Sequence, residues 1–179
     1  MRDIVLPPAK PALEWINGRV LQKVSPRRKH ALAQARFASA LDAWAQARGS
    51  GIAATEWECR IAPPGESRRP LVPDVSNVSY ERVPFDRIDA ADILGIAPNA
   101  VVEVLSPGDH RADVEEKVRV YLACAASVVF LVDTNAQTVT IRDGSAPVVL
   151  GRDQDIKHQS LNGFSMPARQ LFDPPRPKE

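Results

Sequence analysis

A single carboxylate interrupts an apolar run in the second half of the chain. Glu103 stands within Ala-Val-Val-Glu-Val-Leu at residues 100–105, and apolar residues on both faces are typical of a strand in the middle of a sheet. Burial of an unpaired carboxylate is strongly unfavourable, so Glu103 requires a cation, a hydrogen-bond network or a proton. The residue is therefore a candidate for a functional site, and a structural ion pair is the alternative.

The helix predicted after this strand carries one charge on its apolar face. Lys117 is that charge, and the other members of the stripe, which has the spacing of core-facing helical positions, are Val114, Val118, Tyr121, Leu122 and Ala125. A lysine at the edge of such a stripe can cover apolar surface with its stem and leave its ammonium in water. Because the link between strand and helix is short, the ammonium can instead reach Glu103. That pairing would explain both unusual positions.

A second carboxylate, Asp74, follows Pro73 at the start of another predicted strand. An aspartate after a proline is typical of a turn or a strand start, and by itself it indicates no site. Together with Glu103 it supplies the two carboxylates that a hard divalent cation such as Mg²⁺ takes, with water and phosphate oxygens completing the octahedron. Asp74 and Glu103 are thus candidate metal ligands.

The elements that must position these side chains can be located from the prolines. The chain has 16 of them, and none falls in residues 27–62 or 108–146. Since proline interrupts helices and central strands, we expect the regular elements in these two windows. With 179 residues, 44% of them hydrophobic, the chain can form one domain over residues 1–179. The proline-rich ends, about 1–11 and 173–179, are predicted to be poorly ordered.

The N-terminal part predicts a hairpin followed by a helix. Residues 12–16 and 19–23 flank Asn17-Gly18, the pair that most readily forms a tight β-hairpin turn. Ser25-Pro26 supplies an N-cap and a first-turn proline for a helix that runs to about residue 48, before a Gly-Ser-Gly stop. The core-facing residues of this helix are Ala33, Phe37, Leu41 and Trp44.

Strands and one more helix complete the predicted fold. The strands are placed at about residues 52–61, 75–80, 100–105, 128–132 and 139–142, and the helix at about 109–125. Strands that alternate with helices in this way predict an α/β protein. Its expected core is one mixed sheet flanked by helices, with an N-terminal β-hairpin.

Composition excludes several classes of protein. The 23 Lys+Arg and 22 Asp+Glu residues give a net charge of +1, which provides no global field that would coat DNA or a membrane surface. No apolar run approaches the roughly 20 residues of a membrane-spanning helix, so we expect no membrane partner. Cys59 and Cys124 lie among apolar neighbours, which indicates reduced core thiols and a cytoplasmic protein.

Several motifs together carry a family resemblance. They are Pro73-Asp74-Val75, the segment Ala-Pro-Asn-Ala-Val-Val-Glu-Val-Leu-Ser-Pro-Gly at 97–108, and Asp-Val-Glu-Glu-Lys at 113–117 with Tyr121. With them the chain resembles the Uma-two family of restriction-endonuclease-like proteins, which belongs to the PD-(D/E)xK nuclease superfamily. The resemblance covers most of the chain, since its hairpin, first helix and closing segment are similar to residues 13–18, to Ser25-Pro26 with His30, and to residues 161–172.

The resemblance implies a restriction-endonuclease-like fold and a metal-dependent endonuclease that acts on DNA. Asp74 and Glu103 would bind Mg²⁺, for which Mn²⁺ can substitute, and a lysine would assist the attacking water. The usual lysine of the superfamily would stand at position 105, which is Leu105 here and shares a strand face with residue 103. The core-facing Lys117 is our candidate for this role. The predicted catalytic residues are therefore Asp74, Glu103 and Lys117.

Two other interpretations stay open. The near-neutral charge and the missing lysine at position 105 favour a catalytically inactive nuclease-fold domain that binds nucleic acid or protein. The Glu103–Lys117 pair can also be purely structural. If the chain cuts both strands of a duplex, a homodimer with two sites related by a two-fold axis is expected.

Further polar residues are candidates at the edge of this site. His30 either faces the site or packs against the core. Glu56 and Glu58 share one face of a predicted strand, and either one is a third carboxylate ligand or the two belong to a solvated face. Asp113 either orients Lys117 or stabilises the helix N-terminus. There are two basic runs, Arg27-Arg28-Lys29 and Arg68-Arg69. Each run either contacts phosphate or forms ordinary solvated surface.

Overall fold

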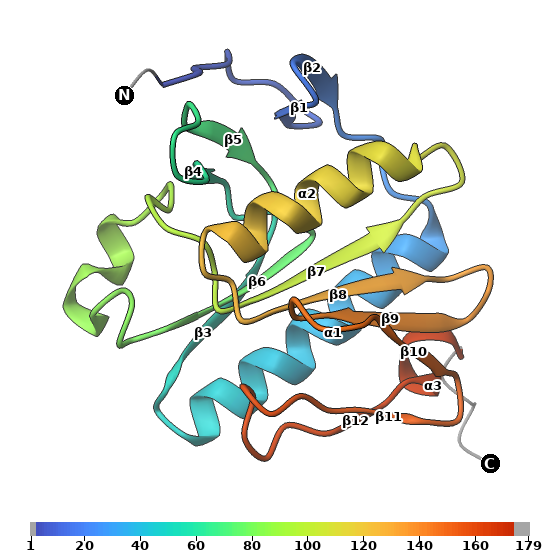
Figure 1. Cartoon of the computed structure of the whole chain (residues 1–179). Coiled ribbons are helices and arrows are strands. Elements are labelled where there is room, and N and C mark those ends of the chain that lie inside the picture. Colours follow the sequence, from blue (N-terminus) through green and yellow to red (C-terminus); the bar gives the residue numbers. More distant parts are fainter. Residues whose placement is uncertain (1–2, 174–179) are drawn as a thin grey trace.

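A six-stranded mixed sheet forms the centre of the computed structural model, which describes residues 3–173 (Figure 1). The helices are α1 (Arg28–Ala47), α2 (Arg111–Ala123) and α3 (Arg169–Phe172), with the 3₁₀ helix η1 (Phe85–Ala90). The strands are β1 (Leu13–Ile16), β2 (Arg19–Gln22), β3 (Gly51–Thr55), β4 (Cys59–Ile61), β5 (Arg69–Leu71), β6 (Val75–Ser79), β7 (Ala100–Leu105), β8 (Val128–Asp133), β9 (Thr138–Arg142), β10 (Val148–Gly151), β11 (Asp155–Ile156) and β12 (Met166–Pro167). The predicted α/β class is confirmed.

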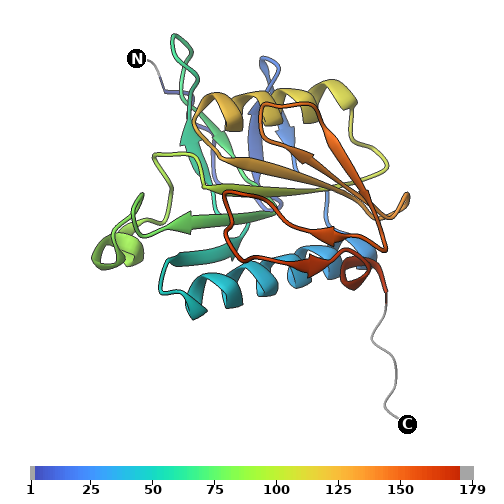
Figure 2. The ribbon, with the colours of Figure 1, turned by 60° about the horizontal axis from the view of Figure 1, so that its bottom comes forward.

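The central sheet has the strand order β10-β9-β8-β7-β6-β3, and α2 crosses over between the parallel strands β7 and β8. The other neighbouring strands are antiparallel. Helix α1 covers one face of the sheet and α2 the opposite face (Figure 2). Because side chains alternate along a strand, Val102 and Val104 pack toward α1, whereas Val101 packs with residues of α2. Glu103 therefore projects to the side of α2.

The N-terminal hairpin forms where its turn residues predict it. Strands β1 and β2 pair antiparallel, with Leu13 opposite Gln22. Asn17 and Gly18 have φ angles of 50° and 76°, the positive values that a two-residue hairpin turn requires. The hairpin is separate from the central sheet, and Ile16 joins the apolar cluster on the α2 side.

Helix α1 begins later than the Ser25-Pro26 motif predicts. Its N-cap position is Arg27, which has an extended backbone and no side-chain cap, so the predicted start is wrong. Residues 23–27 between β2 and α1 are in neither helix nor strand, and Lys23 and Val24 of this segment line the pocket. The predicted stripe is confirmed at Ala33, Phe37 and Leu41, which are fully buried, and at the partly buried Trp44.

The strand predicted at residues 52–61 is also wrong, because the chain turns inside it. Glu56 adopts a positive φ of 52°, and β3 before it pairs with β6 while β4 after it pairs with β5. Trp57, at this break, donates its indole N–H to the carbonyl of Ala91 at 2.8 Å. The segment that the alternation of residue types predicts as one strand thus forms two strands, and each pairs with a different neighbour.

The remaining elements lie near the C-terminus. Strand β10 forms one edge of the central sheet, β11 and β12 form a small ribbon, and α3 packs near α1. The sequence pattern predicted none of these elements. No helix within residues 3–173 is long and apolar enough to span a membrane. The predicted disorder of the ends stays a prediction, and residues 1–2 and 174–179 lie outside the described part of the chain.

Candidate active site

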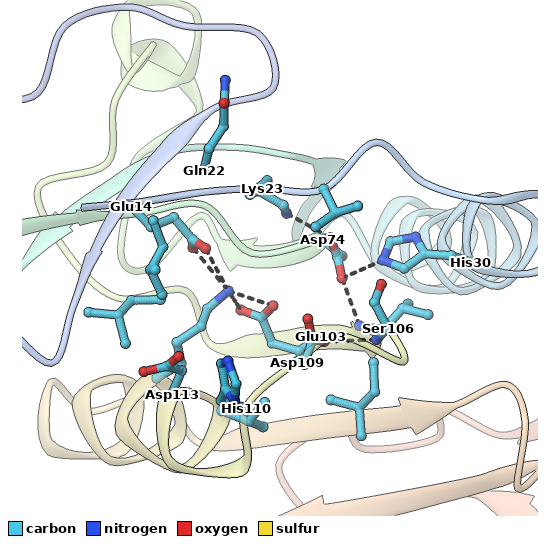
Figure 3. A pocket seen from close by; sticks show the side chains of 18 residues that line it. Glu14, Gln22, Lys23, His30, Asp74, Glu103, Ser106, Asp109, His110 and Asp113 are labelled. Carbon is cyan, nitrogen blue, oxygen red and sulfur yellow. Dashed lines mark hydrogen bonds and ion pairs between the residues drawn. The ribbon is translucent and has the colours of Figure 1, made fainter. Parts of the chain in front are cut away.

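A pocket of about 200 Å³ lies where the hairpin, the start of α1, the end of β7 and the start of α2 meet (Figure 3). Asp74, Glu103 and Lys117 all line it, so the fold brings together the three residues predicted as catalytic. Leu105 lines the same pocket and packs with the apolar cluster beside α2. The position of the usual superfamily lysine is therefore occupied by an apolar side chain.

Asp74, just before β6, is fixed through both of its carboxylate oxygens. Only 2% of the residue is exposed. Lys23 Nζ lies 2.7 Å from Oδ1, the backbone N–H of Val104 donates to Oδ2 at 2.7 Å, and His30 Nε2 lies 3.4 Å from Oδ2. Burial acts to raise the pKa of Asp74, but His30 and the charges of Lys23 and Lys117 outweigh it and hold this pKa well below its ordinary value. Asp74 is therefore an anion at neutral pH.

The predicted contact between Glu103 and Lys117 is present. Lys117 Nζ lies 2.6 Å from Oε1 and 2.7 Å from Oε2 of Glu103, and the Tyr121 hydroxyl donates to Oε1 at 2.9 Å. Burial raises the pKa of Glu103 to about 7, although Lys117 acts to lower it. Burial acts to lower the pKa of Lys117, but the carboxylates of Glu103, Glu14 and Asp74 raise it above its ordinary value. Lys117 therefore remains a cation.

A third carboxylate, Glu14 of β1, completes the surroundings of Lys117. Its Oε1 lies 2.9 Å from Lys117 Nζ and accepts the backbone N–H of Val72 at 2.8 Å, and only 5% of the residue is exposed. Sequence reasoning did not assign Glu14 to the site. The available signal was that Glu14 shares a strand face with Ile16, so that an apolar neighbour marks this face of the hairpin as the buried one.

Lys23 is the second residue that sequence reasoning missed. It follows β2 directly, and its ammonium contacts Asp74 Oδ1 and donates to the carbonyl of Val72 at 2.8 Å. Figure 3 shows Lys23 and His30 approaching Asp74 from different elements. In the linear sequence Lys23 only ends a strand, and nothing there distinguishes it from an exposed lysine.

The donor set fits a hard divalent cation with few protein ligands. Three carboxyl groups face two ammonium groups, and the members of this set are Glu14, Asp74, Glu103, Lys23 and Lys117. Within residues 3–173, no three His, Cys, Asp or Glu side chains are arranged to hold one metal ion. Mg²⁺ commonly takes only one or two carboxylates and fills its octahedron with water and phosphate oxygens. Asp74 and Glu103 are two carboxyl groups that line one pocket, which is the number of protein ligands such an ion takes.

Two of the further candidates have other roles. Asp113 accepts hydrogen bonds from Asn17 Nδ2 at 2.8 Å and from Arg19 at 2.6 Å. It therefore ties the hairpin to α2 rather than orienting Lys117. Arg69 is buried and pairs with Glu66 and Glu116, so it belongs to an internal network.

The other polar candidates divide between the pocket and the outside. His30 lines the pocket, whereas Glu56 and Glu58 do not. Glu58 pairs instead with Arg60 at 2.9 Å. Arg28 and Lys29 border a separate, smaller pocket near α3. The site thus contains the predicted carboxylates and lysine together with His30, Glu14 and Lys23.

The fold and the sequence of this chain are similar to those of known proteins. The structure is similar to the crystal structure of a putative nuclease belonging to DUF820 from Anabaena variabilis, with a TM-score of 0.81 and 27% sequence identity over 93% of each chain. No curated protein sequence matches this chain significantly. This chain shares the α/β fold of that structure. The model of the Uma2 family, described as putative restriction endonuclease, matches residues 4–169, and the chain belongs to this family.

Proposed function

We propose that this protein is a Mg²⁺-dependent endonuclease that hydrolyses phosphodiester bonds in DNA, with Mn²⁺ as a possible substitute. The observation that supports this most is the convergence in one pocket of Asp74 just before β6, Glu103 on β7 and Lys117 on α2. Membership of a family described as putative restriction endonuclease, and the similarity to a structure described as a putative nuclease, support the reaction class in general. DNA as the substrate, a homodimer that cuts both strands, and a cytoplasmic location are parts of the same proposal.

Asp74 and Glu103 would hold the metal ion. When bound, such an ion polarises a phosphoryl oxygen and lowers the pKa of its water. Asp74 is suited to this because its carboxylate is ionised and held in place by the N–H of Val104. Tyr121 fixes Glu103 from the side of the core through its 2.9 Å hydrogen bond. Both carboxylates therefore have defined orientations.

Lys117 would act as a cation. Its raised pKa keeps the ammonium protonated, so it donates hydrogen bonds and does not remove a proton. An ammonium at this position orients the attacking water or offsets the charge that develops on the phosphate. Glu14 and Glu103 hold it from two sides, which keeps its position defined.

Cleavage of supercoiled plasmid and of oligonucleotides, in Mg²⁺ or Mn²⁺, tests this proposal. We expect Asp74→Asn and Glu103→Gln to lower the cleavage rate by about a hundredfold or more, the order found when a group that stabilises the transition state is lost. Asp153→Asn is the matched control, since this carboxylate is 81% exposed and lies outside the pocket. If the wild-type protein cuts no faster than the Asp74 and Glu103 variants on every substrate, the proposal is wrong.

A second candidate is a catalytically inactive nuclease-fold domain that binds nucleic acid or protein. Leu105 at the place of the superfamily lysine favours it. Titration calorimetry with Mn²⁺ separates the two candidates. An inactive domain shows no heat that disappears specifically in the Asp74 and Glu103 variants, whereas a metal-dependent nuclease does.

A further inference from the structure

The Lys23 ammonium occupies an oxygen that a metal ion at Asp74 would use. Asp74 Oδ2 is committed to the backbone N–H of Val104 at 2.7 Å, with His30 nearby. Asp74 Oδ1 contacts Lys23 Nζ at 2.7 Å. Since Oδ2 is tied to the backbone of β7, Oδ1 is the oxygen that can change its partner without movement of the sheet.

We propose that Lys23 is an exchangeable counter-cation of Asp74. Its ammonium balances this carboxylate in the metal-free protein and leaves Oδ1 when a divalent cation binds. Mg²⁺ lies about 2.0–2.1 Å from its ligand oxygens, and a second positive charge on the same oxygen would be strongly repelled in a buried site. The inference rests on the proposed metal site, and it adds that metal affinity is set by competition with a lysine of the same chain.

The position of Lys23 permits such an exchange. Lys23 stands directly after β2 and lines the pocket beside Val24, which is 70% exposed. The Lys23 side chain itself is 13% exposed, so it lies at the border of the pocket with solvent, and a released ammonium could reach water through its flexible stem. Lys117 differs, because it stands within a helix and is held between the two carboxylates of Glu14 and Glu103. Lys117 keeps its contact with Glu14 even if a metal ion takes an oxygen of Glu103, whereas within residues 3–173 Asp74 is the one carboxylate that Lys23 contacts.

Titration calorimetry with Mn²⁺ on the full-length protein is the first test. Lys23→Met removes the competing charge, and we expect it to bind Mn²⁺ about tenfold more tightly than the wild type and to have a lower Tm without metal. Lys157→Met is the matched control, because Lys157 forms an exposed ion pair with Asp155 outside this pocket. It should bind Mn²⁺ like the wild type. Adding Asp74→Asn should abolish the gain from Lys23→Met.

A second variant keeps the proposal testable if Lys23→Met does not fold. Lys23→Gln keeps a hydrogen-bond donor toward the carbonyl of Val72 but carries no charge, and it should also bind Mn²⁺ more tightly. If the wild type binds Mn²⁺ through Asp74 and neither variant gains affinity, the exchange is wrong while the metal site stands. If the wild type shows no Asp74-dependent binding, the metal site itself is wrong and the exchange falls with it.

Chemical labelling follows the movement of Lys23 directly. An amine-acylating reagent, with peptide mapping by mass spectrometry, measures how fast each lysine of the wild-type protein reacts. Saturating Mn²⁺ should accelerate the labelling of Lys23 severalfold, because its ammonium is then released from Asp74, and should leave that of Lys157 unchanged. Equal labelling of Lys23 with and without Mn²⁺, under conditions where calorimetry shows binding, would overturn the exchange.

Discussion

Lys117 has surroundings that distinguish it from an ordinary structural lysine. Two carboxylates from distant parts of the chain hold its ammonium, and Asp74 adds a third negative charge nearby. Replacing a buried ion pair by apolar side chains is often neutral or stabilising, whereas removing one partner is costly. Three acidic groups around one lysine therefore carry a cost in stability that a purely structural role does not require.

Lys117→Met should expose this cost. The change leaves Glu14 and Glu103 buried without their cation, and because Lys117 acts to lower the pKa of Glu103, that pKa rises further in the folded state. A raised folded-state pKa contributes stability at low pH that is lost as pH rises, so the loss relative to wild type should be about 3–5 kcal/mol near neutral pH and smaller near about pH 5. Urea unfolding in the presence of a chelator measures both values.

The cleavage rate of the same variant decides between the two roles of Lys117. If Lys117 assists the reaction, Lys117→Met loses cleavage even at temperatures where the variant is folded. An unchanged cleavage rate together with the loss of stability would mean that the pair with Glu103 is only structural.

Among the elements, the β1–β2 hairpin does most to complete the pocket. It contributes Glu14, and the residue directly after it contributes Lys23. Asn17 and Arg19, in and after its turn, both donate hydrogen bonds to Asp113 at the start of α2. The hairpin is thus fixed to α2 at its turn while its strand residues reach the site.

Asp113→Asn tests this connection. Burial acts to raise the pKa of Asp113, but the hydrogen bonds from Asn17 and Arg19 lower it below its ordinary value. A lowered pKa contributes stability above the unfolded-state pKa, and this is lost as pH falls through the folded-state value. We expect the free energy of unfolding to fall by about 1 kcal/mol or less at neutral pH, because Arg19 is half exposed.

The free energy of unfolding in urea, measured at decreasing pH, checks the sign of this effect. The difference between wild type and Asp113→Asn should vanish at acid pH, where the wild-type carboxylate is protonated. Asp86→Asn, at an exposed position of η1, should match the wild type throughout. A difference for Asp113→Asn that stays constant down to acid pH would contradict the proposed cause.

At the scale of the whole molecule, Phe37 joins the layers of the core. Its ring lies 5.3 Å from that of Phe130 on β8 and 6.2 Å from that of Phe164 near the C-terminus. Phe37→Ala should lower the free energy of unfolding by about 3–5 kcal/mol, measured by denaturant unfolding. Phe85→Ala, at a residue that is 71% exposed, should change it by about 0.5 kcal/mol or less. Equal effects of the two changes would mean that the core is packed differently.

Local signals account for the parts of the fold that the sequence predicts. Asn17-Gly18 determines the hairpin turn by its own backbone preference, and periodicity reveals the stripe of α1 and the β7–α2–β8 unit. The break at Glu56 depends instead on which strand each half pairs with, which the alternation of residue types does not encode. Strands of two residues and a helix of one turn, such as β11 and α3, are too short to show a period.

The residues of the candidate site also divide into those that local signals predict and those that depend on distant contacts. Asp74 stands out as a turn residue at the start of a predicted strand. Glu103 and Lys117 stand out as charges within a predicted strand and a predicted helix. Glu14 and Lys23 acquire their roles only when the hairpin docks against α2 and β5. The local pattern marks only the face of Glu14 as buried, and the partners of both residues are set by long-range contacts that no sequence window around either residue contains.

The contact between Glu14 and Lys117 also has a consequence for folding kinetics. The two residues are 103 positions apart in the chain, and contacts of such separation must close a long loop before they gain stability. We therefore expect the hairpin to dock late, after the local β7–α2–β8 unit has formed. During refolding, secondary structure should then recover before any Asp74-dependent binding of Mn²⁺, because the pocket is finished by one of the slowest steps.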